Sequence, residues 1–289
     1  MTTTITTSPS CVRAALAVPP NVRLSDLDPS ATPCFPGTGP QDAAQLTTQL
    51  SKELGTWQEK LYAGSKAKPT PPQRMLVVLQ GMDTAGKSGV VRHVFGLVDP
   101  QGVKIHAFKQ PTEEELAHDF LWRIEKQVPP AGYIGIFDRS QYEDVLVVRV
   151  DELVPPSQWE PRFEQINQFE ASLVDSGVTI IKFFLHISPD EQKARLLGRL
   201  NNPNKYWKYS PGDIPVRSKW AEYMAAYEDV LNRCNQDIAP WYAIPSNNKW
   251  YRNWAIANIL LDHLRQMNPA YPGPSFDVDE QITAVENSL

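Results

Sequence analysis

The chain has 289 residues, 42% of them hydrophobic, enough to bury the core of one large domain or two small ones. Its net charge of −5 excludes a protein that binds polyanions over its whole surface, and no apolar run approaches the roughly 18 residues of a membrane span. The first 20 residues contain one Arg and no long apolar core, so we expect no secretory signal and a cytoplasmic protein without a membrane partner.

The N-terminal residues 1–40 are rich in Thr, Ser and Pro and show no hydrophobic period, so we expect a flexible extension. The three cysteines, Cys11, Cys34 and Cys234, are isolated and odd in number, and they indicate neither a disulfide framework nor a metal site. From residue 41 to 62, apolar side chains recur at steps of three and four. This spacing predicts an amphipathic helix.

The glycine-rich stretch 81–88, Gly-Met-Asp-Thr-Ala-Gly-Lys-Ser, fits the pattern G-x-x-x-x-G-K-[ST]. The apolar run 75–79 precedes it and apolar residues at helical spacing follow at 90–98, so the stretch connects a strand to a helix. In that setting, backbone N–H groups and the positive end of the helix hold phosphate oxygens. Lys87 then reaches the transferred phosphoryl group, and the Ser88 hydroxyl is placed for Mg²⁺. The alternative is an ordinary glycine-rich turn.

A second strand is predicted at 103–108, where apolar and polar residues alternate. Lys109 follows at the strand end where open α/β sheets bind ligands, so it either contacts substrate phosphate or is a surface lysine. A capping box that begins at Thr112 opens a helix extending to the next pair of prolines. Within that helix Asp119 and Arg123 lie one turn apart, and they form either a structural ion pair or part of a site.

The third strand, 133–138, ends in Asp138, an aspartate of the Walker B type within reach of Mg²⁺ or its waters. Arg139 follows directly, and its planar donor group suits phosphate oxygens better than a lysine would. Glu143 and Asp144 add two carboxylates within the next few residues, which is dense for a turn. The alternative for this cluster is an acid-rich helix cap.

Three further elements precede the basic part of the chain. Ser157 and Glu160 form a predicted capping box for a helix that ends at the following glycine. The nearly unbroken apolar run 178–187 is typical of a strand buried on both faces, and we interpret His186 within it as a core histidine. A third capping box, 188–191, has Pro at the first helical position and begins the next helix.

Residues 193–219 carry seven basic side chains and one acid, a local charge of +6 on an acidic protein. The part at 201–217 is polar, contains helix-breaking residues and interleaves cations with aromatic rings, which predicts a mobile lid that grips phosphates or stacks a base. A solvated basic face is the alternative. The basic residues are Lys193, Arg195, Arg199, Lys205, Lys208, Arg217 and Lys219.

The C-terminal part is predicted to contain helices at 220–231 and 250–267 and a short strand at 241–245. Because strands alternate with helices throughout, we predict an α/β protein with three layers, in which helices cover both faces of a parallel sheet. The predicted organisation is an N-terminal extension (1–40), one phosphate-loop domain (41–270) with a helical lid at about 200–220, and an acidic tail (271–289).

A phosphate loop, a strand-end aspartate, a following arginine and a basic lid are together the groups that phosphoryl transfer requires. Such reactions need the donor and acceptor in line, Mg²⁺ across the oxygens, and cations near the developing charge. A lid that closes supplies the cations and excludes water. The spacing therefore predicts a kinase for a small acceptor, without identifying the phosphoryl donor.

The chain resembles the polyphosphate kinase 2 family from about Leu54 to Asn268. Many blocks occur in one order, which makes the resemblance specific. The seven-cation lid agrees with a polymeric donor, because a chain of phosphates needs more partners than a triphosphate does. The matching blocks are Gly81–Lys87, Phe108–Pro111, His118–Arg123, Phe137–Leu146, Lys182–Ser188, Glu191–Gln192, Asn204–Lys208, Ala239–Trp241 and Lys249–Arg252.

The resemblance implies a P-loop kinase fold of the thymidylate-kinase type with a helical lid. It also implies Mg²⁺-dependent, reversible transfer of a terminal phosphoryl group between inorganic polyphosphate and a nucleotide, with Mn²⁺ as an alternative metal. The implied catalytic residues are Asp83, Lys87, Arg139 and Glu143, and the implied metal contacts are Asp83, Asp138 and Glu143. The implied phosphate contacts are Gly81, Thr84, Ala85, Gly86, Lys87, Ser88, Lys109, Arg123, Arg195, Arg199, Lys205 and Lys208.

The run Tyr142-Glu143-Asp144 resembles branches of the family that accept nucleoside monophosphates, one of which also accepts diphosphates. We therefore expect AMP and ADP as acceptors, with ATP as product, together with the guanine equivalents GMP, GDP and GTP. We also expect a homo-oligomer, a dimer or a tetramer, and no nucleic-acid partner. Two alternatives stay open: an ATP-dependent nucleoside monophosphate kinase, and a non-catalytic sensor of nucleotides or polyanions.

Overall fold

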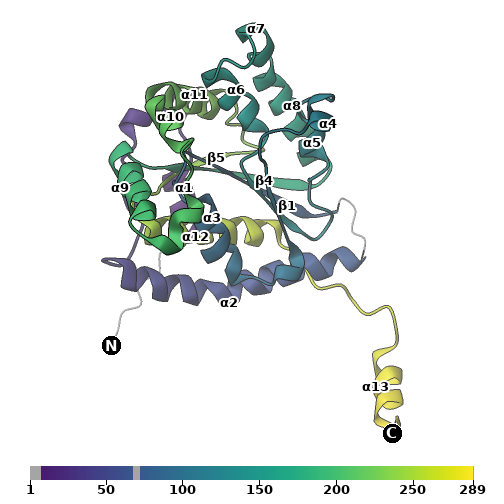
Figure 1. Ribbon diagram of the computed structural model, residues 1–289. Helices are drawn as coiled ribbons and strands as arrows, with labels where there is room; N and C mark the ends of the chain where they lie inside the picture. Colours follow the sequence, from purple (N-terminus) through teal and green to yellow (C-terminus); the bar gives the residue numbers. More distant parts are fainter. Residues whose placement is uncertain (1–7, 68–71, 289) are drawn as a thin grey trace.

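A five-stranded sheet forms the centre of the protein, in a computed structural model that describes residues 8–67 and 72–288 (Figure 1). The strand order β2-β3-β1-β4-β5 places β1 in the middle, with β3 and β4 as its neighbours. Every pair is parallel, so the carboxyl ends of all five strands meet at one edge. The predicted α/β class is confirmed. The strands are β1 (Arg74–Gln80), β2 (Val103–Ala107), β3 (Ile134–Asp138), β4 (Val178–His186) and β5 (Trp241–Pro245).

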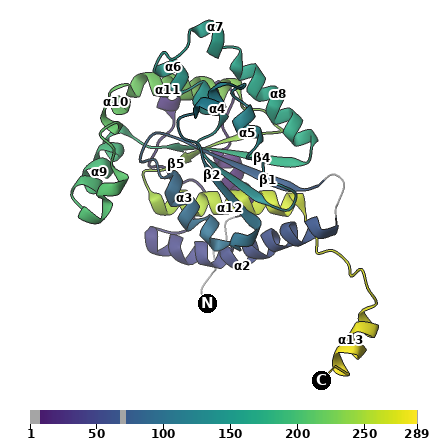
Figure 2. The ribbon, with the colours of Figure 1, turned by 45° about the vertical axis from the view of Figure 1, so that its right-hand side comes forward.

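Helices cover both faces of the sheet, as the alternation of elements predicted (Figures 1 and 2). On one face α12 (Lys249–Met267) packs against β5, and α2 (Pro40–Gly64) lies on the outer side of α12 with α3 (Lys87–His93) beside it. Because α12 is enclosed in this way, 13 of its residues are buried. The other face carries α6 (Val147–Val150), α7 (Pro156–Trp159), α8 (Arg162–Asp175) and α11 (Trp220–Arg233).

Two predicted helices differ from the observed ones. The capping box of Thr112 and Glu115 forms, but its helix stops after one turn and a new helix begins at Trp122. In the turn between them the Asp119 side chain accepts the N–H of Leu121 at 2.9 Å, a local bond that competes with a continuous helix. The predicted box at 157–160 does not form. Instead, two helices form, α7 beginning at Pro156 and α8 following Pro161. Pro161 separates them because it has no N–H to continue α7. The remaining short helices here are α4 (Glu113–Leu116) and α5 (Trp122–Glu125).

The N-terminal segment is packed on the domain, where the composition predicted a flexible extension. Val12 and Leu16 of α1 (Pro9–Leu16) are buried, and α1 contacts α12 and β5. The N–H of Val18 donates to the carbonyl of Trp241 at 3.0 Å, so this segment continues the edge of the sheet beyond β5. Val12 and Leu16 lie on one side of α1, but two apolar positions are too few to stand out as a helical period, and the surface they cover is provided by the rest of the chain. Residues 1–7 lie outside the described part.

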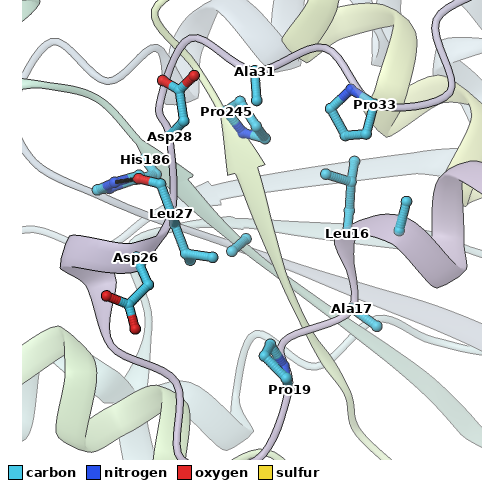
Figure 3. Close-up of a pocket in the computed structure, with 12 residues that line it drawn as sticks. Leu16, Ala17, Pro19, Asp26, Leu27, Asp28, Ala31, Pro33, His186 and Pro245 are labelled. Atoms are coloured by element: carbon cyan, nitrogen blue, oxygen red, sulfur yellow. Dashed lines mark hydrogen bonds between the residues drawn. The ribbon is translucent and has the colours of Figure 1, made fainter.

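The strap, which we define as residues 17–34, covers the carboxyl ends of β4 and β5 (Figure 3). A disulfide between Cys11 and Cys34 closes it, which corrects the expectation that the cysteines are unpaired; Cys234 is free and buried. His186 is a core histidine, as predicted, and its Nε2 lies 3.1 Å from the carbonyl of Leu27 in the strap. A mostly apolar cavity of about 400 Å³ lies under the strap, and none of its lining residues belongs to the stretch 81–88.

The lid is helical, as predicted, and the tail contains a helix that was not predicted. In the lid, α9 (Pro189–Leu200) leads into η6 (Pro203–Lys208) and α10 (Asp213–Ser218). In the tail, α13 (Val278–Glu286) stands away from the domain (Figures 1 and 2). Within residues 8–67 and 72–288, no helix is long and apolar enough to cross a bilayer. The short 3₁₀ helices elsewhere are η1 (Leu24–Asp26), η2 (Ser65–Ala67), η3 (Phe95–Leu97), η4 (Pro100–Gly102) and η5 (Gln141–Asp144).

Candidate active site

The glycine-rich stretch forms a tight loop between the end of β1 and the start of α3. Gly81 and Gly86 have φ angles of +146° and +114°, which favour glycine. A side chain would also fail for lack of room, since a Cβ at Gly81 would lie 2.7 Å from the carbonyl oxygen of Leu185. The Lys87 side chain is buried and its Nζ donates to the carbonyl of Gly81 at 2.7 Å, so the lysine spans the loop. Ser88, the last residue of the pattern, is exposed.

The acids and the arginine after β3 lie beside this loop because β3 is the neighbour of β1. Leu79 is in register with Asp138, and the Arg139 N–H donates to the carbonyl of Leu79 at 3.1 Å. Arg139 Nη2 then donates to Asp83 Oδ1 in the loop, also at 3.1 Å. The structure therefore joins residues separated by 56 positions into one ion pair. Asp138 itself is half-buried at the strand end, where its carbonyl accepts the N–H of Phe108.

Glu143 completes the group of charges around the loop. Burial raises the pKa of Glu143, and the positive charges of Arg139 and Lys87 act against that rise. Burial lowers the pKa of Arg139, but Glu143 and Asp83 outweigh it and the net pKa lies above the ordinary value. The four residues predicted as catalytic, Asp83, Lys87, Arg139 and Glu143, are thus close enough to influence one another's charge.

A buried ion pair fixes the turn that carries Glu143. Lys182 and Glu170 are both 0% exposed, and Lys182 Nζ lies 2.5 Å from Glu170 Oε2. The other oxygen of Glu170 accepts bonds from the Tyr142 hydroxyl at 2.7 Å and from Gln141 Nε2 at 2.9 Å. The residues on the N-terminal side of Glu143 are therefore anchored to the core, while Glu143 faces the loop. Lys182 was not among the predicted site residues, although a charge within the apolar run 178–187 is visible in the sequence.

Arg195 supports the phosphate loop from the lid side. Its Nη1 donates to the carbonyls of Thr84 and Ala85 at 2.8 and 3.0 Å, and its Nη2 donates to the carbonyls of Ser246 and Asn247. Its Nε pairs with Glu191 at 2.6 Å. All five N–H groups of the guanidinium are engaged by protein oxygens. In this conformation Arg195 holds the loop in place, which differs from the predicted direct contact with phosphate.

Arg252 is a second arginine at the loop, and the sequence-based assignment missed it. It is 2% exposed, and its Nη1 donates to the carbonyl of Ala85 at 3.0 Å. A Cβ at Gly86 would lie 1.8 Å from the same nitrogen, so the second glycine of the pattern makes room for Arg252. Burial and the charge of Arg195 lower the pKa of Arg252 to about 9. The only signal in the sequence was its place in the block Lys249–Arg252.

The lid cations divide into bonded arginines and exposed lysines. Arg199 Nη1 donates to the carbonyl of Lys208 at 2.6 Å and lies 3.5 Å from Asp213. Arg217 bonds Gln192 Oε1 at 2.8 Å, and Gln192 Nε2 donates to the carbonyl of Asp83 at 3.0 Å, which connects the lid to the phosphate loop. Within the part of the chain that the structure describes, the exposed basic residues of this group are Lys193, Lys205 and Lys208.

The lysines nearest the loop create a positive surface there. Burial lowers the pKa of Lys249, and the charges of Arg195, Arg252 and Lys205 lower it further. Lys205 of the lid therefore lies on the same side as the arginines that hold the loop. Lys249 was not predicted as a site residue. This concentration of positive charge suits a substrate with several negative charges.

The two residues predicted near the end of β2 have different roles. Lys109 is exposed, and its carbonyl accepts a bond from Arg123 Nη1 at 2.9 Å. Arg123 is 6% exposed, lies 3.6 Å from Glu115 and stacks over Phe108. Its structural role is therefore to hold the loop after β2, with Glu115 as its partner rather than Asp119. Lys109 stays available to a ligand.

The metal contacts were predicted to be Asp83, Asp138 and Glu143. Among the residues that the structure describes, no three His, Cys, Asp or Glu side chains gather into a site that holds a metal by itself. Asp83 and Glu143 nevertheless place hard carboxylate oxygens beside the phosphate loop. Mg²⁺ is usually held by one or two carboxylates together with substrate phosphates and water. The donor set therefore fits Mg²⁺ that binds with a phosphorylated substrate.

The parallel sheet, the loop at the end of its central strand and the helical lid define a P-loop kinase fold. The profile of the family described as Polyphosphate kinase 2 matches residues 40–272. The chain belongs to this family and is a polyphosphate kinase.

Relatives and a solved structure agree with this assignment. The chain is 48% identical over 251 residues to AMP/ADP-polyphosphate phosphotransferase of Meiothermus ruber, covering 87% of this chain and 91% of the relative. It is 38% identical over 239 residues to ADP-polyphosphate phosphotransferase of Rhodopseudomonas palustris, covering 78% and 80%. The crystal structure of polyphosphate kinase 2 from Arthrobacter aurescens TC1 is 46% identical, covers 97% of both chains and has a TM-score of 0.92.

Proposed function

We propose that the protein transfers the terminal phosphoryl group of inorganic polyphosphate to nucleoside mono- and diphosphates, reversibly and with Mg²⁺. The observation that carries the proposal is the convergence of Asp83, Lys87, Arg139 and Glu143 on a phosphate loop that faces a basic lid. The names of the relatives supply the substrate class, polyphosphate with AMP or ADP. Adenine and guanine nucleotides are both included, because the loop and its cations contact phosphates.

The chemistry needs positioning and charge more than covalent help. Backbone N–H groups of the loop and the start of α3 hold phosphate oxygens in a fixed place. Lys87 turns from the Gly81 carbonyl to the transferred group, where its charge offsets the negative charge that develops. Asp83 holds the Arg139 guanidinium at 3.1 Å, so that its free N–H groups face the acceptor phosphate without reorganisation. Glu143 orients the acceptor beside them.

Asp83 and Glu143 are the residues that would hold Mg²⁺, with Asp138 within reach of its waters and Mn²⁺ as a substitute. The ion would neutralise phosphate oxygens and align donor with acceptor. The protein's own part is to keep two carboxylates next to two cations. Because Arg139 already neutralises Asp83, the site tolerates a cluster of acids before any substrate binds.

The exposed lid lysines favour polyphosphate over ATP as the donor. Lys205 and Lys208 are exposed and make no ion pair among the described residues, whereas the lid arginines are occupied. Each lysine that neutralises a phosphate of a polyanion adds to the salt dependence of binding. Changing both to Gln should lower the salt slope of polyphosphate binding by roughly two and leave nucleotide binding nearly unchanged. Lys193→Gln, on the outer side of α9, is the matched control.

A single assay tests the function. The protein is incubated with ADP, Mg²⁺ and polyphosphate but no ATP, and ATP formation is measured. Lys87→Ala should abolish turnover while retaining some nucleotide binding, because the backbone of the loop is unchanged. If no ATP forms, but ATP and AMP together give ADP, the enzyme is a nucleoside monophosphate kinase and the donor assignment is wrong.

Glu143 is the residue we propose to determine acceptor choice. Glu143→Gln keeps the size of the side chain and removes its charge, so it should reduce transfer to AMP more than to ADP. The comparison of kcat/KM for AMP, ADP, GMP and GDP measures this. An equal loss for mono- and diphosphates would show that Glu143 serves transfer itself and not acceptor choice.

A further inference from the structure

The helix α13 presents an apolar face to solvent. Val278, Ile282 and Val285 follow one another at steps of four and three, so they lie on one side of the helix, and they are 45%, 50% and 70% exposed. No residue of α13 is buried, and the helix stands clear of the domain in both views (Figures 1 and 2). A free helix of nine residues is marginal in water. Stable helicity at this place therefore requires a partner that covers the apolar face.

The charge of the tail indicates what kind of surface that partner has. Residues 271–288 contain four acids and no Lys or Arg. A surface that receives the tail must therefore offer exposed apolar groups with basic side chains around them. The acids are Asp277, Asp279, Glu280 and Glu286.

The chain itself carries such a surface on the lid, which we call the lid patch. Fourteen large hydrophobic residues are exposed in the described chain; five belong to the tail and five to the lid patch. Lys193, Lys205 and Lys208 border the patch, and the exposed small residues Ala194 and Gly198 leave room for another helix to approach α9. The apolar members of the lid patch are Leu197, Leu200, Tyr206, Trp207 and Ile214.

Other exposed apolar residues do not fit the tail. Leu116 follows three glutamates and Leu153 follows Asp151 and Glu152, so both would repel an acidic helix. Ile105 and Ile238 are single exposed residues outside either group. Within the described residues, the lid patch alone combines several exposed apolar side chains with positive charge.

The tail leads away from the lid patch of its own chain (Figures 1 and 2). The Tyr271 hydroxyl donates to Glu59 Oε2 at 3.1 Å, which fixes the start of the tail near the C-terminal end of α2. Val278 lies seven positions after Tyr271, and this stretch spans at most about 25 Å. The lid lies over the opposite end of α2 in both views, and a helix of 25 residues is about 37 Å long. Because the tail is directed away from its own lid and the lid patch complements it in charge, we take the partner to be another copy of the chain.

We propose that α13 of one copy docks on the lid patch of a second copy, with Val278, Ile282 and Val285 facing Leu197 and Leu200. The acids of the tail then face Lys193 and, at the edge of the patch, Lys205 and Lys208. The contact therefore shares two lysines with the polyphosphate site of the proposed function. It makes the lid, the part that has to move over the substrate, part of the interface between subunits.

Disulfide trapping tests the geometry directly. Leu197→Cys is placed in unlabelled protein and Ile282→Cys in ¹⁵N-labelled protein, and the two are mixed and oxidised. We expect a covalent product that contains one labelled and one unlabelled chain, with the 197–282 link identified by peptide mass spectrometry. Lack of this product, or a link that forms only when both cysteines are in one chain, would overturn the proposal. Glu113→Cys with Ile282→Cys, which pairs the tail with an acidic surface, is the control that should give no product.

Sedimentation measures the contribution of the contact to assembly. Leu197→Asp adds a charge that repels the tail, and Ile282→Asp disrupts the apolar face; each should raise the dissociation constant of the oligomer at least tenfold. Thr283→Asp adds the same charge on the polar side of α13 and should leave the mass unchanged. A wild-type protein that sediments as a monomer, or variants that all assemble alike, would show that the tail does not dock on a second copy.

Discussion

The buried pair of Lys182 and Glu170 provides a quantitative test of how the site is held. Lys182 Nζ uses all three of its donors, on Glu170 Oε2 at 2.5 Å, the Tyr142 hydroxyl at 2.9 Å and the carbonyl of Cys234 at 2.7 Å. Both charges are fully removed from water. Removing one partner leaves the other charge buried without compensation, which typically costs 3–5 kcal/mol, on the order of half the stability of many domains.

We therefore expect Lys182→Met and Glu170→Leu each to lower the free energy of unfolding by about 3–5 kcal/mol. The double variant buries no charge. It leaves neutral groups without their bonds, namely the donors of Tyr142 and Gln141 and the carbonyl of Cys234, at about 1–3 kcal/mol each. It should cost about as much as either single change, well below their sum, so the coupling energy is about 3 kcal/mol.

Urea unfolding at constant pH measures all four proteins, and equal m values show that the transitions are comparable. Single variants whose effects simply add in the double variant would refute the reasoning, because they would mean that the two charges do not depend on each other. Turnover of the double variant then shows whether anchoring of Tyr142 matters to its neighbour Glu143 independently of stability.

Further predictions concern pH, the disulfide and the loop. Burial raises the pKa of Asp144 from 3.8 to about 6. The free energy of unfolding of the wild-type protein should therefore fall by up to about 3 kcal/mol as the pH rises from about 4 to about 6. Asp144→Asn should remove this dependence, which unfolding measured at several pH values tests. Cys11 and Cys34 are 23 residues apart, and reducing the disulfide between them should lower the free energy of unfolding by about 3 kcal/mol. An unfolding midpoint that is the same with and without reductant would contradict this. Arg252→Lys keeps the charge but loses the guanidinium hydrogen bond to the carbonyl of Ala85. In steady-state kinetics kcat/KM should then fall by about tenfold or more. Unchanged kinetics would show that Arg252 does not shape the loop.

The local elements of the fold could be predicted because their signals are local. The loop 81–88 needs glycines at two positions, and the strands before it and after it are apolar runs whose length and pattern are visible in the sequence. The family blocks then directed attention to Arg139 and Glu143, and the structure brings both to the loop. The predicted helices through Asp119 and Pro161 were each too long. The first is interrupted by a turn at Asp119, and Pro161 has no N–H to continue the second, yet neither feature changes the apolar spacing.

The packing of the N-terminal segment could not be predicted from composition. Its buried residues Val12 and Leu16 are one helical turn apart, which is too short a signal to identify a packed helix. The surface they cover is formed by α12 and β5, more than 200 positions later in the chain. The Cys11–Cys34 disulfide was missed for the same reason, since the two cysteines meet only when both ends of the segment pack.

The class of chemistry can be read from the amino-acid order alone, because phosphate binding depends on backbone geometry that glycines and a lysine at fixed spacing specify. The role of each cation, by contrast, depends on which groups the folded chain brings next to it. Arg195 and Arg123 were both predicted to bind phosphate. In the structure their N–H groups donate instead to carbonyl oxygens and carboxylates of the protein. Arg252, 167 positions from its partner Ala85, reaches the loop. A charge in a sequence has no partner until folding brings one within hydrogen-bond distance, and that partner decides whether it binds substrate or supports the site.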